Sequence, residues 1–270
     1  MTIAAGFRCL DGILLCSDSQ FTGADKEFRD KIITHFDGRS HIAFAFSGDE
    51  DYARSAIEDC IGKIDESPLD NTPQAIKACI RETISDMSIQ YRNHYPDGVD
   101  KPEFLVSIST PDEQLQLFRA RDSVMPSVHD LAFLGCGAYL GEYILEAFFG
   151  GQFVSIEDTL LPAIFALTAA VGHDPYCGGH LQFYGIRGQR FQRTWFNCHN
   201  DALTSIIRNF QHECGTIMLF MSGSKEDYFK RALESFPNKI TELRDELMSH
   251  EAYRGLLRFM RDTISEISQT

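Results

Sequence analysis

The residue that follows the initiator methionine is a threonine, Thr2. Methionine aminopeptidase removes Met1 before a small residue, and that step would leave Thr2 with a free α-amine. Such a residue holds a nucleophile and a base together. Its hydroxyl attacks a carbonyl, and its amine, with a pKa of about 7.7–8.0, accepts the proton near neutral pH. Most chains that begin Met-Thr are not hydrolases, so the alternative is that Thr2 simply begins a strand.

Other polar and glycine-rich segments adjoin apolar runs along the chain. Asp18 directly follows the apolar run that ends at Cys16-Ser17, and Lys31 stands immediately before Ile32-Ile33. Taken singly, Asp18 is best interpreted as a turn-capping carboxylate and Lys31 as a solvated lysine at a strand edge. Three further segments combine small and polar residues: Ser47-Gly48, Gly135-Cys136-Gly137 and Asp174-Pro175-Tyr176-Cys177-Gly178-Gly179.

The elements that position these residues are predicted from hydrophobic periodicity. Four strands precede any helix, as two hairpins over 3–7 and 13–16 and over 32–36 and 41–46. Apolar residues at helical spacing predict helices over 52–64 and 73–95. The expected elements that follow are strands at 104–109, 115–120 and 131–134, helices at 138–149 and 156–171, and strands at 181–186 and 191–196.

The order of these elements predicts the fold class. Strands and helices occur in separate groups, which does not indicate a parallel βαβ sheet. It favours two antiparallel sheets that pack together and are covered by helices on both outer faces, an α+β four-layer αββα sandwich. We expect this domain over 1–196 and a mostly helical C-terminal extension over 197–270, packed on it, with helices at 201–212, 225–234 and 239–268 and a strand at 216–220.

The motifs, in order and in spacing, resemble the β-type subunits of proteasomes and the bacterial proteasome-like peptidases, which are N-terminal nucleophile hydrolases. The mature chains of that family begin at a Thr, which is followed by a strand, a glycine turn and an apolar strand that ends in an Asp-Ser pair. Thr2, Gly12 and Asp18-Ser19 resemble these features in order and in spacing. Lys31, Ser47-Gly48, Gly135-Cys136-Gly137 and the segment from Asp174 to Gly179 resemble further motifs of the family. The resemblance covers about residues 2–195 and implies the N-terminal nucleophile hydrolase fold.

The resemblance also implies a role for each site residue. Lys31 would favour the developing alkoxide of Thr2 and lower the pKa of the α-amine, while Asp18 would hold Lys31 charged and fixed. The N–H of Gly48 would stabilise the oxyanion, a contribution often worth about 3 kcal/mol. Asp174 joins this catalytic set, although its other interpretation is a hydrogen-bond acceptor within its own loop.

Two cysteines depart from the family pattern. Cys136 and Cys177 stand where the family usually has serines that orient the amine and relay protons. A thiol is a weaker hydrogen-bond donor and acceptor, although it is more acidic. Either the two thiols support catalysis with a differently tuned network, or they impair it. The remaining alternative is that both are small buried core residues.

Composition and charge exclude several classes of function. The 270 residues carry 25 Lys and Arg against 39 Asp and Glu, a net charge of −14 that disfavours nucleic acids and anionic membranes. No apolar stretch is long enough to span a membrane and no signal peptide is recognisable, so we expect a cytoplasmic protein with reduced thiols. The spacing of Cys198-His199 and His212-x-Cys214 matches no common zinc pattern, and we expect no metal and no cofactor.

The resemblance implies a threonine endopeptidase that forms an acyl-Thr intermediate and cleaves proteins or peptides within a homo-oligomeric ring or spiral. An ATPase unfoldase or another protein would be a further partner. Two alternatives remain open, namely an amidohydrolase of the same fold that acts on non-peptide substrates, and a non-catalytic subunit that only builds a ring. For assembly, we expect the apolar stripes of helices 52–64 and 73–95 to face neighbouring subunits.

Overall fold

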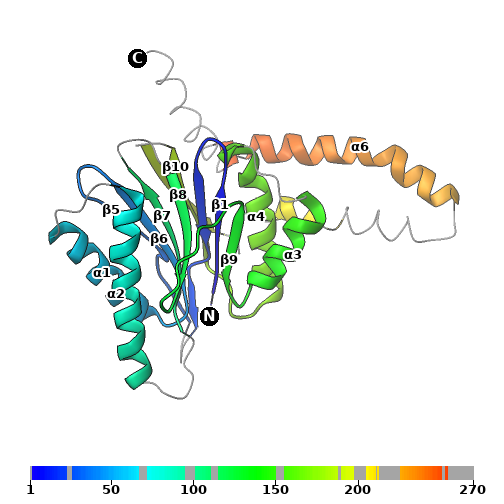
Figure 1. Cartoon of the computed structure of the whole chain (residues 1–270). Coiled ribbons are helices and arrows are strands. Elements are labelled where there is room, and N and C mark those ends of the chain that lie inside the picture. Colours follow the sequence, from blue (N-terminus) through cyan, green and yellow to red (C-terminus); the bar gives the residue numbers. More distant parts are fainter. Residues whose placement is uncertain are drawn as a thin grey trace, which may run out of the picture. The chain divides into compact units, whose positions relative to one another are not determined.

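The computed structural model divides into two compact units, residues 1–195 and 196–270. Figure 1 shows the course of the chain from the N-terminal strands to the C-terminal helix. The residues that the structure describes are 2–22, 26–66, 72–94, 101–110, 115–149, 155–187, 190–197, 205–210, 212, 226–250 and 253–254.

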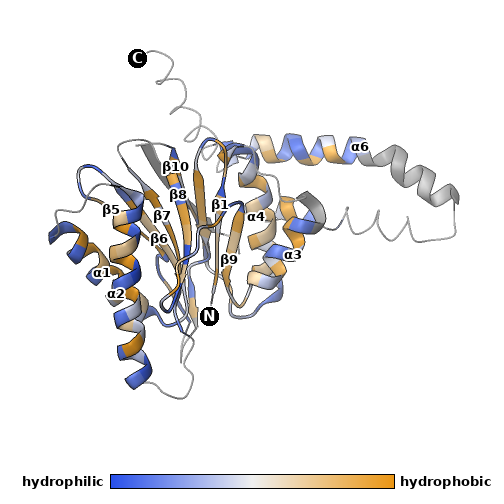
Figure 2. Cartoon of the chain, in the orientation of Figure 1, coloured by the Kyte–Doolittle hydropathy of each residue, from blue (hydrophilic) through white to orange (hydrophobic). Residues whose placement is uncertain are grey.

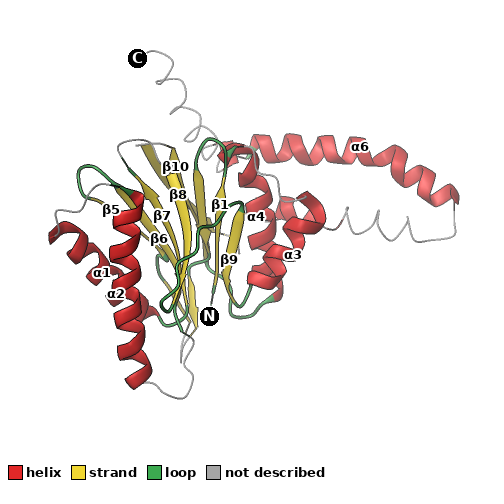
Figure 3. Cartoon of the chain, in the orientation of Figure 1, coloured by secondary structure: helices red, strands yellow, loops and turns green. Residues whose placement is uncertain are grey.

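Two antiparallel sheets form the centre of the first unit. The five-stranded sheet has the order β11-β10-β2-β1-β9, and the four-stranded sheet has the order β5-β6-β7-β8. The α+β class and the antiparallel sheets predicted from the sequence are therefore confirmed (Figure 3). The bounds of these strands are β1 Ile3–Arg8, β2 Ile13–Ser17, β5 Ile32–Phe36, β6 His41–Ser47, β7 Glu103–Ser109, β8 Leu115–Arg121, β9 Leu131–Gly135, β10 His180–Arg187 and β11 Arg190–Asn197.

The alternation of side chains along β6 divides the core in two. Phe44 and Phe46 belong to a cluster shared with the first two helices, whereas Ala43 and Ala45 belong to a second cluster shared with the strands of the other sheet. Successive residues of a strand point to opposite faces, so one strand serves both clusters. The small alanine side chains on the inner face allow the two sheets to approach each other closely.

The helices of the first unit cover the outer faces of the two sheets. Helices α1 (Glu50–Glu66) and α2 (Pro73–His94) contact the four-stranded sheet, and α3 (Ala138–Phe149) and α4 (Ile156–His173) contact the five-stranded sheet. Figure 2 shows hydrophobic and hydrophilic faces on α1 and α2, as expected for helices that lie on a sheet.

The apolar stripes of α1 and α2 do not have the role that we expected from the sequence. Ile57 on α1 and Ile80 and Ile84 on α2 are buried in the cluster formed with Phe44 and Phe104 of the adjacent sheet. A stripe that is already buried within its own chain is not available to a neighbouring subunit. The expectation that these stripes face other subunits is therefore wrong.

A short two-stranded sheet lies between the second and fifth strands. Strands β3 (Gln20–Thr22) and β4 (Lys26–Phe28) pair antiparallel with Phe21 opposite Glu27. Six strands thus precede the first helix, where the sequence predicted four. Each added strand has three residues, which is too short for alternation to be recognised.

The second unit contains one long helix among its described residues, α6 (Glu226–Ser249). The sequence predicted two helices here, 225–234 and 239–268. Instead Pro237 lies inside α6, and the Thr241 hydroxyl donates to the Pro237 carbonyl at 2.8 Å. Residues 205–210 are helical, within the predicted helix 201–212. The predicted strand at 216–220 and the residues of 239–268 beyond 254 lie outside the described residues.

None of the helices in the described part of the chain has both the length and the apolar character needed to cross a bilayer.

Candidate active site

The pairing of β1 with β2 brings Thr2 next to Asp18. Ala4 lies opposite Ser17 in this antiparallel pair, which places Asp18 beside the residues that begin β1. The Asp18 N–H donates to the Ile3 carbonyl at 3.1 Å, and the Ile3 N–H donates to Asp18 Oδ1 at 3.2 Å. The Thr2 hydroxyl donates to the same carboxylate oxygen. The intervening residues 3–17 thus form a hairpin whose open end holds both side chains.

Lys31 reaches the same point from the other sheet. It immediately precedes β5, and its side chain is fully buried, as is that of Asp18. The Lys31 Nζ atom lies 2.6 Å from Asp18 Oδ1 and also donates to the Thr2 hydroxyl oxygen and to the Gln20 carbonyl. All three donor positions of the ammonium are therefore used, and the two sheets are joined at the Thr2 hydroxyl.

Asp18 is also tied to the loop after α4. Its second oxygen, Oδ2, accepts the Gly178 N–H at 2.8 Å, and the Gly178 carbonyl accepts the N–H groups of Ser19 and Gln20 at 3.2 and 3.0 Å. Both carboxylate oxygens of Asp18 therefore have donors. A buried charge of this kind is stabilised only when it is paired and hydrogen-bonded, and Asp18 meets both conditions.

The environment of Lys31 determines its charge. Burial lowers the pKa of Lys31, and the carboxylate of Asp18 opposes this effect by favouring the ammonium. The ammonium also lies 4.5 Å from the centre of the Phe21 ring, a cation–π arrangement. An ammonium with a reduced pKa, held against a hydroxyl, can stabilise an alkoxide at that hydroxyl.

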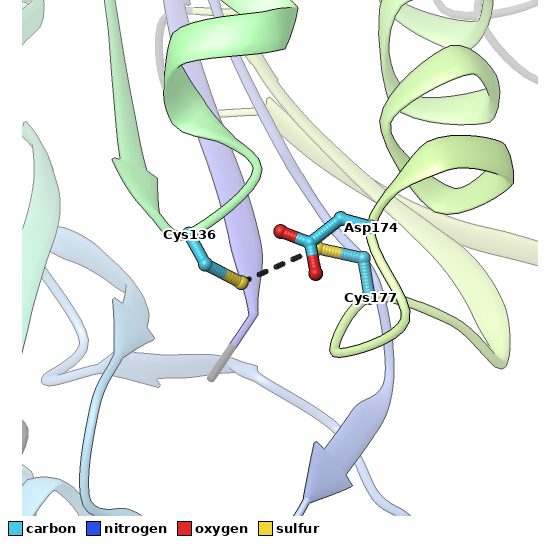
Figure 4. A group of neighbouring side chains, drawn as sticks. All are labelled: Cys136, Asp174 and Cys177. Atoms are coloured by element: carbon cyan, nitrogen blue, oxygen red, sulfur yellow. Dashed lines mark hydrogen bonds between the residues drawn. The ribbon is translucent and has the colours of Figure 1, made fainter.

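Cys136 and Cys177 lie beside the backbone of Thr2. The Cys136 thiol donates to the Thr2 carbonyl at 3.4 Å, and its sulfur is 3.7 Å from the sulfur of Cys177. Figure 4 shows the two sulfur atoms pointing toward each other, with the Asp174 carboxylate beside them. Asp174 caps the C-terminus of α4, and its Oδ1 accepts the Tyr176 N–H at 2.9 Å. None of the described contacts joins Asp174 to Thr2.

The contact between the two thiols shifts their pKa values in opposite directions. The hydrogen bond from Cys177 lowers the pKa of Cys136, with burial acting in the opposite sense. The same hydrogen bond, together with burial, raises the pKa of Cys177. Cys136 is exposed and Cys177 is buried, so Cys136 is the thiol that solvent reaches.

Gly135 allows the close approach of β9 to Thr2. Its φ is +87°, and a Cβ at this position would collide with the Thr2 carbonyl oxygen. In the antiparallel pair of β1 and β9, Gly135 lies opposite Ile3, the residue that follows Thr2. A side chain at Gly135 would therefore be strained by its backbone conformation and would displace Thr2.

Gly48 lies at the end of β6, half-buried, with φ of +97°. A Cβ there would be 2.7 Å from the Lys101 carbonyl oxygen, so the position requires glycine. Because β5 and β6 are antiparallel and Ile32 pairs with Ala45, Gly48 follows β6 at the end where Lys31 precedes β5. No hydrogen bond among the described residues joins Gly48 to Thr2.

Gln182 belongs to this cluster and was not recognised from the sequence. Its Oε1 accepts the Lys31 N–H at 2.9 Å and the Ser17 hydroxyl at 3.2 Å, and its Nε2 donates to Asp30 at 2.7 Å. The side chain is buried in β10 and ties the second strand of the hairpin to the start of β5. The available signal was one amide in the otherwise apolar run Leu181-Gln182-Phe183.

The sequence named four residues as possible metal ligands, and their outcome differs from that of the site residues. Cys198, His199 and Cys214 lie outside the described residues, and His212 belongs to the second unit. A different set of possible ligands is found within the described part of the chain, formed by Cys136, Asp174 and Cys177.

Comparison with known proteins shows a fold shared with Anbu proteins. The chain matches a structure titled "Helical Assembly of the Anbu Complex" from Pseudomonas aeruginosa with a TM-score of 0.70 at 16% identity, over 84% of this chain and 99% of that one. It matches Anbu, an ancestral β-subunit, from Yersinia bercovieri with a TM-score of 0.68 at 14% identity, over 83% and 98%. Anbu from Hyphomicrobium sp. strain MC1 matches with a TM-score of 0.67 at 10% identity, over 83% and 98%.

No family model matches the chain, and no curated protein sequence matches it. The resemblance to proteasome β-type subunits and bacterial proteasome-like peptidases is corrected by the structural matches, which are to Anbu proteins. A threonine, an Asp-Ser pair and a lysine before a strand are short motifs that mark positions brought together by the fold. Such motifs therefore do not distinguish one group of proteins with this fold from another. The chain therefore has an α+β fold that it shares with the Anbu proteins.

Proposed function

We propose that the protein is a threonine hydrolase that cleaves amide bonds in peptides, with Thr2 as nucleophile once Met1 is removed. The observation that carries this proposal is the buried contact of Thr2, Asp18 and Lys31, in which one ammonium is bound to both the hydroxyl and the carboxylate. Burying two charges beside a hydroxyl carries a desolvation penalty that lowers the stability of a fold. Such a pair is therefore expected where the charges have a function or hold several elements together.

The first chemical step uses the two groups of Thr2. The hydroxyl oxygen attacks the carbonyl carbon of the substrate while the α-amine takes the hydroxyl proton. The Lys31 ammonium stabilises the negative charge that develops on the attacking oxygen, and Asp18 keeps Lys31 in place. The Gly48 N–H is assigned to the substrate oxyanion, and its position at the same sheet end as Lys31 supports this role.

The second step releases the product. The protonated amine gives its proton to the leaving amine, the carbon–nitrogen bond breaks, and an ester joins the acyl group to Thr2. Water then attacks this ester with the α-amine as base, which restores the hydroxyl. Every proton transfer in this scheme occurs at Thr2, and no cofactor is used.

Cys136 and Cys177 stand where proteasome β-type subunits usually have serines, and we assign both thiols to holding the start of β1. The hydrogen bond from the Cys136 thiol to the Thr2 carbonyl supports this assignment. Asp174 orients the loop that carries Cys177, since the Asp174 carbonyl accepts the Cys177 N–H at 3.1 Å. Its contribution to the chemistry is therefore positional.

We further propose that the domain is a four-layer αββα sandwich of the N-terminal nucleophile hydrolase type and that copies of the chain assemble. The helices on the outer faces of the two sheets support the first point. The helical assembly described for Anbu from Pseudomonas aeruginosa supports the second. Light scattering at micromolar concentration tests the assembly, and a monodisperse monomer would contradict it.

Turnover of fluorogenic peptides by Thr2→Ala and Thr2→Ser variants tests the proposed activity. Thr2→Ala keeps the strand but lacks the hydroxyl, so turnover should be abolished while folding is retained. Thr2→Ser keeps the nucleophile and its neighbours and should retain turnover. Undiminished turnover in Thr2→Ala would overturn the proposal. Turnover of small non-peptide amides but not of peptides would replace the peptidase by an amidohydrolase.

A further inference from the structure

Three potential metal ligands from two separate segments converge beside Thr2. Cys136 lies in the turn between β9 and α3, whereas Asp174 and Cys177 lie in the turn that follows α4. Their ligand atoms, two sulfurs and a carboxylate oxygen, all lie within 4.8 Å of one another. Figure 4 shows the three side chains directed toward a common point.

The spacing of the two sulfur atoms matches that of a tetrahedral zinc site. With Zn–S bonds of about 2.3 Å, two thiolates that share a tetrahedral zinc ion lie about 3.8 Å apart. The observed distance between the sulfur atoms of Cys136 and Cys177 is 3.7 Å. The two donors therefore already have the required separation, and only the carboxylate needs to adjust.

The backbone around these residues fixes the donors. The Cys177 N–H donates to the Asp174 carbonyl at 3.1 Å, which closes a turn with both side chains at its ends. The Tyr176 N–H donates to Asp174 Oδ1 at 2.9 Å and orients the carboxylate. Hydrogen bonds that hold a ligand in this way are typical of the outer shell of metal sites.

The cluster is accessible from solvent on one side. Cys136 is exposed and Asp174 is half-buried, whereas Cys177 is 3% exposed and lies against the backbone of Gly137. An ion can therefore enter from solvent at Cys136 and Asp174 and bind to Cys177 on its buried side. Soft thiolates combined with one carboxylate favour zinc over magnesium or calcium.

We propose that Cys136, Asp174 and Cys177 form a binding site for one Zn²⁺ ion, with the fourth position open to water. Binding replaces the two thiol protons, so Zn²⁺, two thiols and one carboxylate give a complex of charge −1 and two released protons. The site does not depend on the proposed hydrolase activity, although binding removes the thiol proton that Cys136 otherwise donates to the Thr2 carbonyl.

Titration of the reduced, chelator-treated protein with Co²⁺ tests this site, because thiolate ligands give an intense charge-transfer absorption in the near ultraviolet. Wild type should bind one Co²⁺ per chain at this site, and Zn²⁺ should displace it. The Cys136→Ser and Cys177→Ser variants should bind more than about 100-fold more weakly, since changes in the outer shell alone cost about 10–100-fold. Asp174→Asn should also weaken binding.

The matched control is Cys79→Ser, which removes a half-buried cysteine of α2 and should leave the absorption unchanged. Absence of the absorption in wild type, or its survival at equal affinity in the Cys136→Ser/Cys177→Ser double variant, would overturn the proposal. A measurement on wild type alone is independent of variant folding. Saturating Zn²⁺ should protect Cys136 from iodoacetamide in peptide mapping, and unprotected Cys136 contradicts the site.

Discussion

The ammonium of Lys31 lies 2.6 Å from the carboxylate of Asp18, and neither side chain is exposed to solvent. Asp18 directly follows β2 and Lys31 directly precedes β5, and because these strands belong to different sheets, the pair joins the two sheets. The Thr2 hydroxyl contacts both members. The position of the nucleophile thus depends on the packing of the two sheets as well as on its own strand.

The first prediction concerns the contribution of Lys31 to turnover. Lys31→Ala removes the group that stabilises the alkoxide and should lower kcat by about 100-fold or more, the usual effect of losing one electrostatic contact to a developing charge. Lys26→Ala is the matched control, because the Lys26 side chain is exposed and, among the described residues, its ammonium donates to the Pro175 carbonyl. Equal kcat values for the two variants would argue against a catalytic role for Lys31.

The second prediction concerns pH. In Asp18→Asn the buried Lys31 loses its carboxylate partner, so the pKa of Lys31 should fall further below its unfolded value of about 10.4. The unfolded chain then binds more protons than the folded chain, and stability rises with pH between the folded and unfolded pKa values. The deficit of this variant relative to wild type in urea unfolding should therefore shrink between pH 7 and about pH 10.

A pH-independent deficit would show that Lys31 is not the group affected. The Asp18→Asn/Lys31→Met double variant serves as the control, because it removes the titrating group and should show no such recovery relative to wild type.

The third prediction separates backbone strain from displacement of Thr2. Gly135 and Gly38 have nearly the same φ, +87° and +86°, but a Cβ at Gly38 would meet nothing within 4 Å. Gly38→Ala should cost about 1–2 kcal/mol of stability and leave turnover unchanged. Gly135→Ala should cost more stability and lower turnover by about 100-fold, because Thr2 is displaced. Similar turnover in both variants would contradict this account.

The fourth prediction concerns Gln182. Gln182→Ala leaves the Lys31 N–H and the Ser17 hydroxyl without their acceptor, and it should lower the free energy of unfolding by about 2–4 kcal/mol. Gln116→Ala, at a half-buried position of β8, should have an effect below about 1 kcal/mol. Urea unfolding of both variants measures the difference, and equal effects would mean that the Gln182 hydrogen bonds add nothing.

The fifth prediction concerns thiol reactivity. Burial raises the pKa of Cys9 to about 11 and that of Cys60 to about 12, whereas Cys136 is exposed and has a lowered pKa. Because the thiolate is the reactive form, iodoacetamide should modify Cys136 much faster than Cys9 or Cys60 in the reduced, metal-free protein at neutral pH. Peptide mapping over time measures the three rates. Faster modification of Cys60 would contradict the burial described.

Much of the fold was predictable because the strands have strong periodic patterns. The hairpin of Ile3–Arg8 and Ile13–Ser17 and the helix Ala138–Phe149 follow from apolar spacing and turn residues. The strands of three residues, Gln20–Thr22 and Lys26–Phe28, carry too little pattern. The continuation of α6 through Pro237 also contradicts a local rule, because a proline in a helix interior usually ends or kinks it.

The site was predictable where residues adjoin strand ends. Thr2, Asp18 and Lys31 each flank a predicted strand, and antiparallel pairing brings such ends together. Gln182 lies within a strand and gives no comparable signal, since one buried amide has many structural uses. The convergence of Cys136 with Asp174 and Cys177 depends on how two distant turns meet, so the spacing within either segment did not give it, and only the family resemblance implied that these residues lie near Thr2.

The most direct test of the central claim is reaction with an electrophile that requires both the hydroxyl and the α-amine of an N-terminal threonine, such as a peptide epoxyketone, followed by intact mass and peptide mapping. We expect a chain that has lost Met1 and carries one adduct on Thr2, with the adduct strongly reduced in Lys31→Ala. A chain that retains Met1, or an adduct on any other residue while Thr2 stays unmodified, would contradict it.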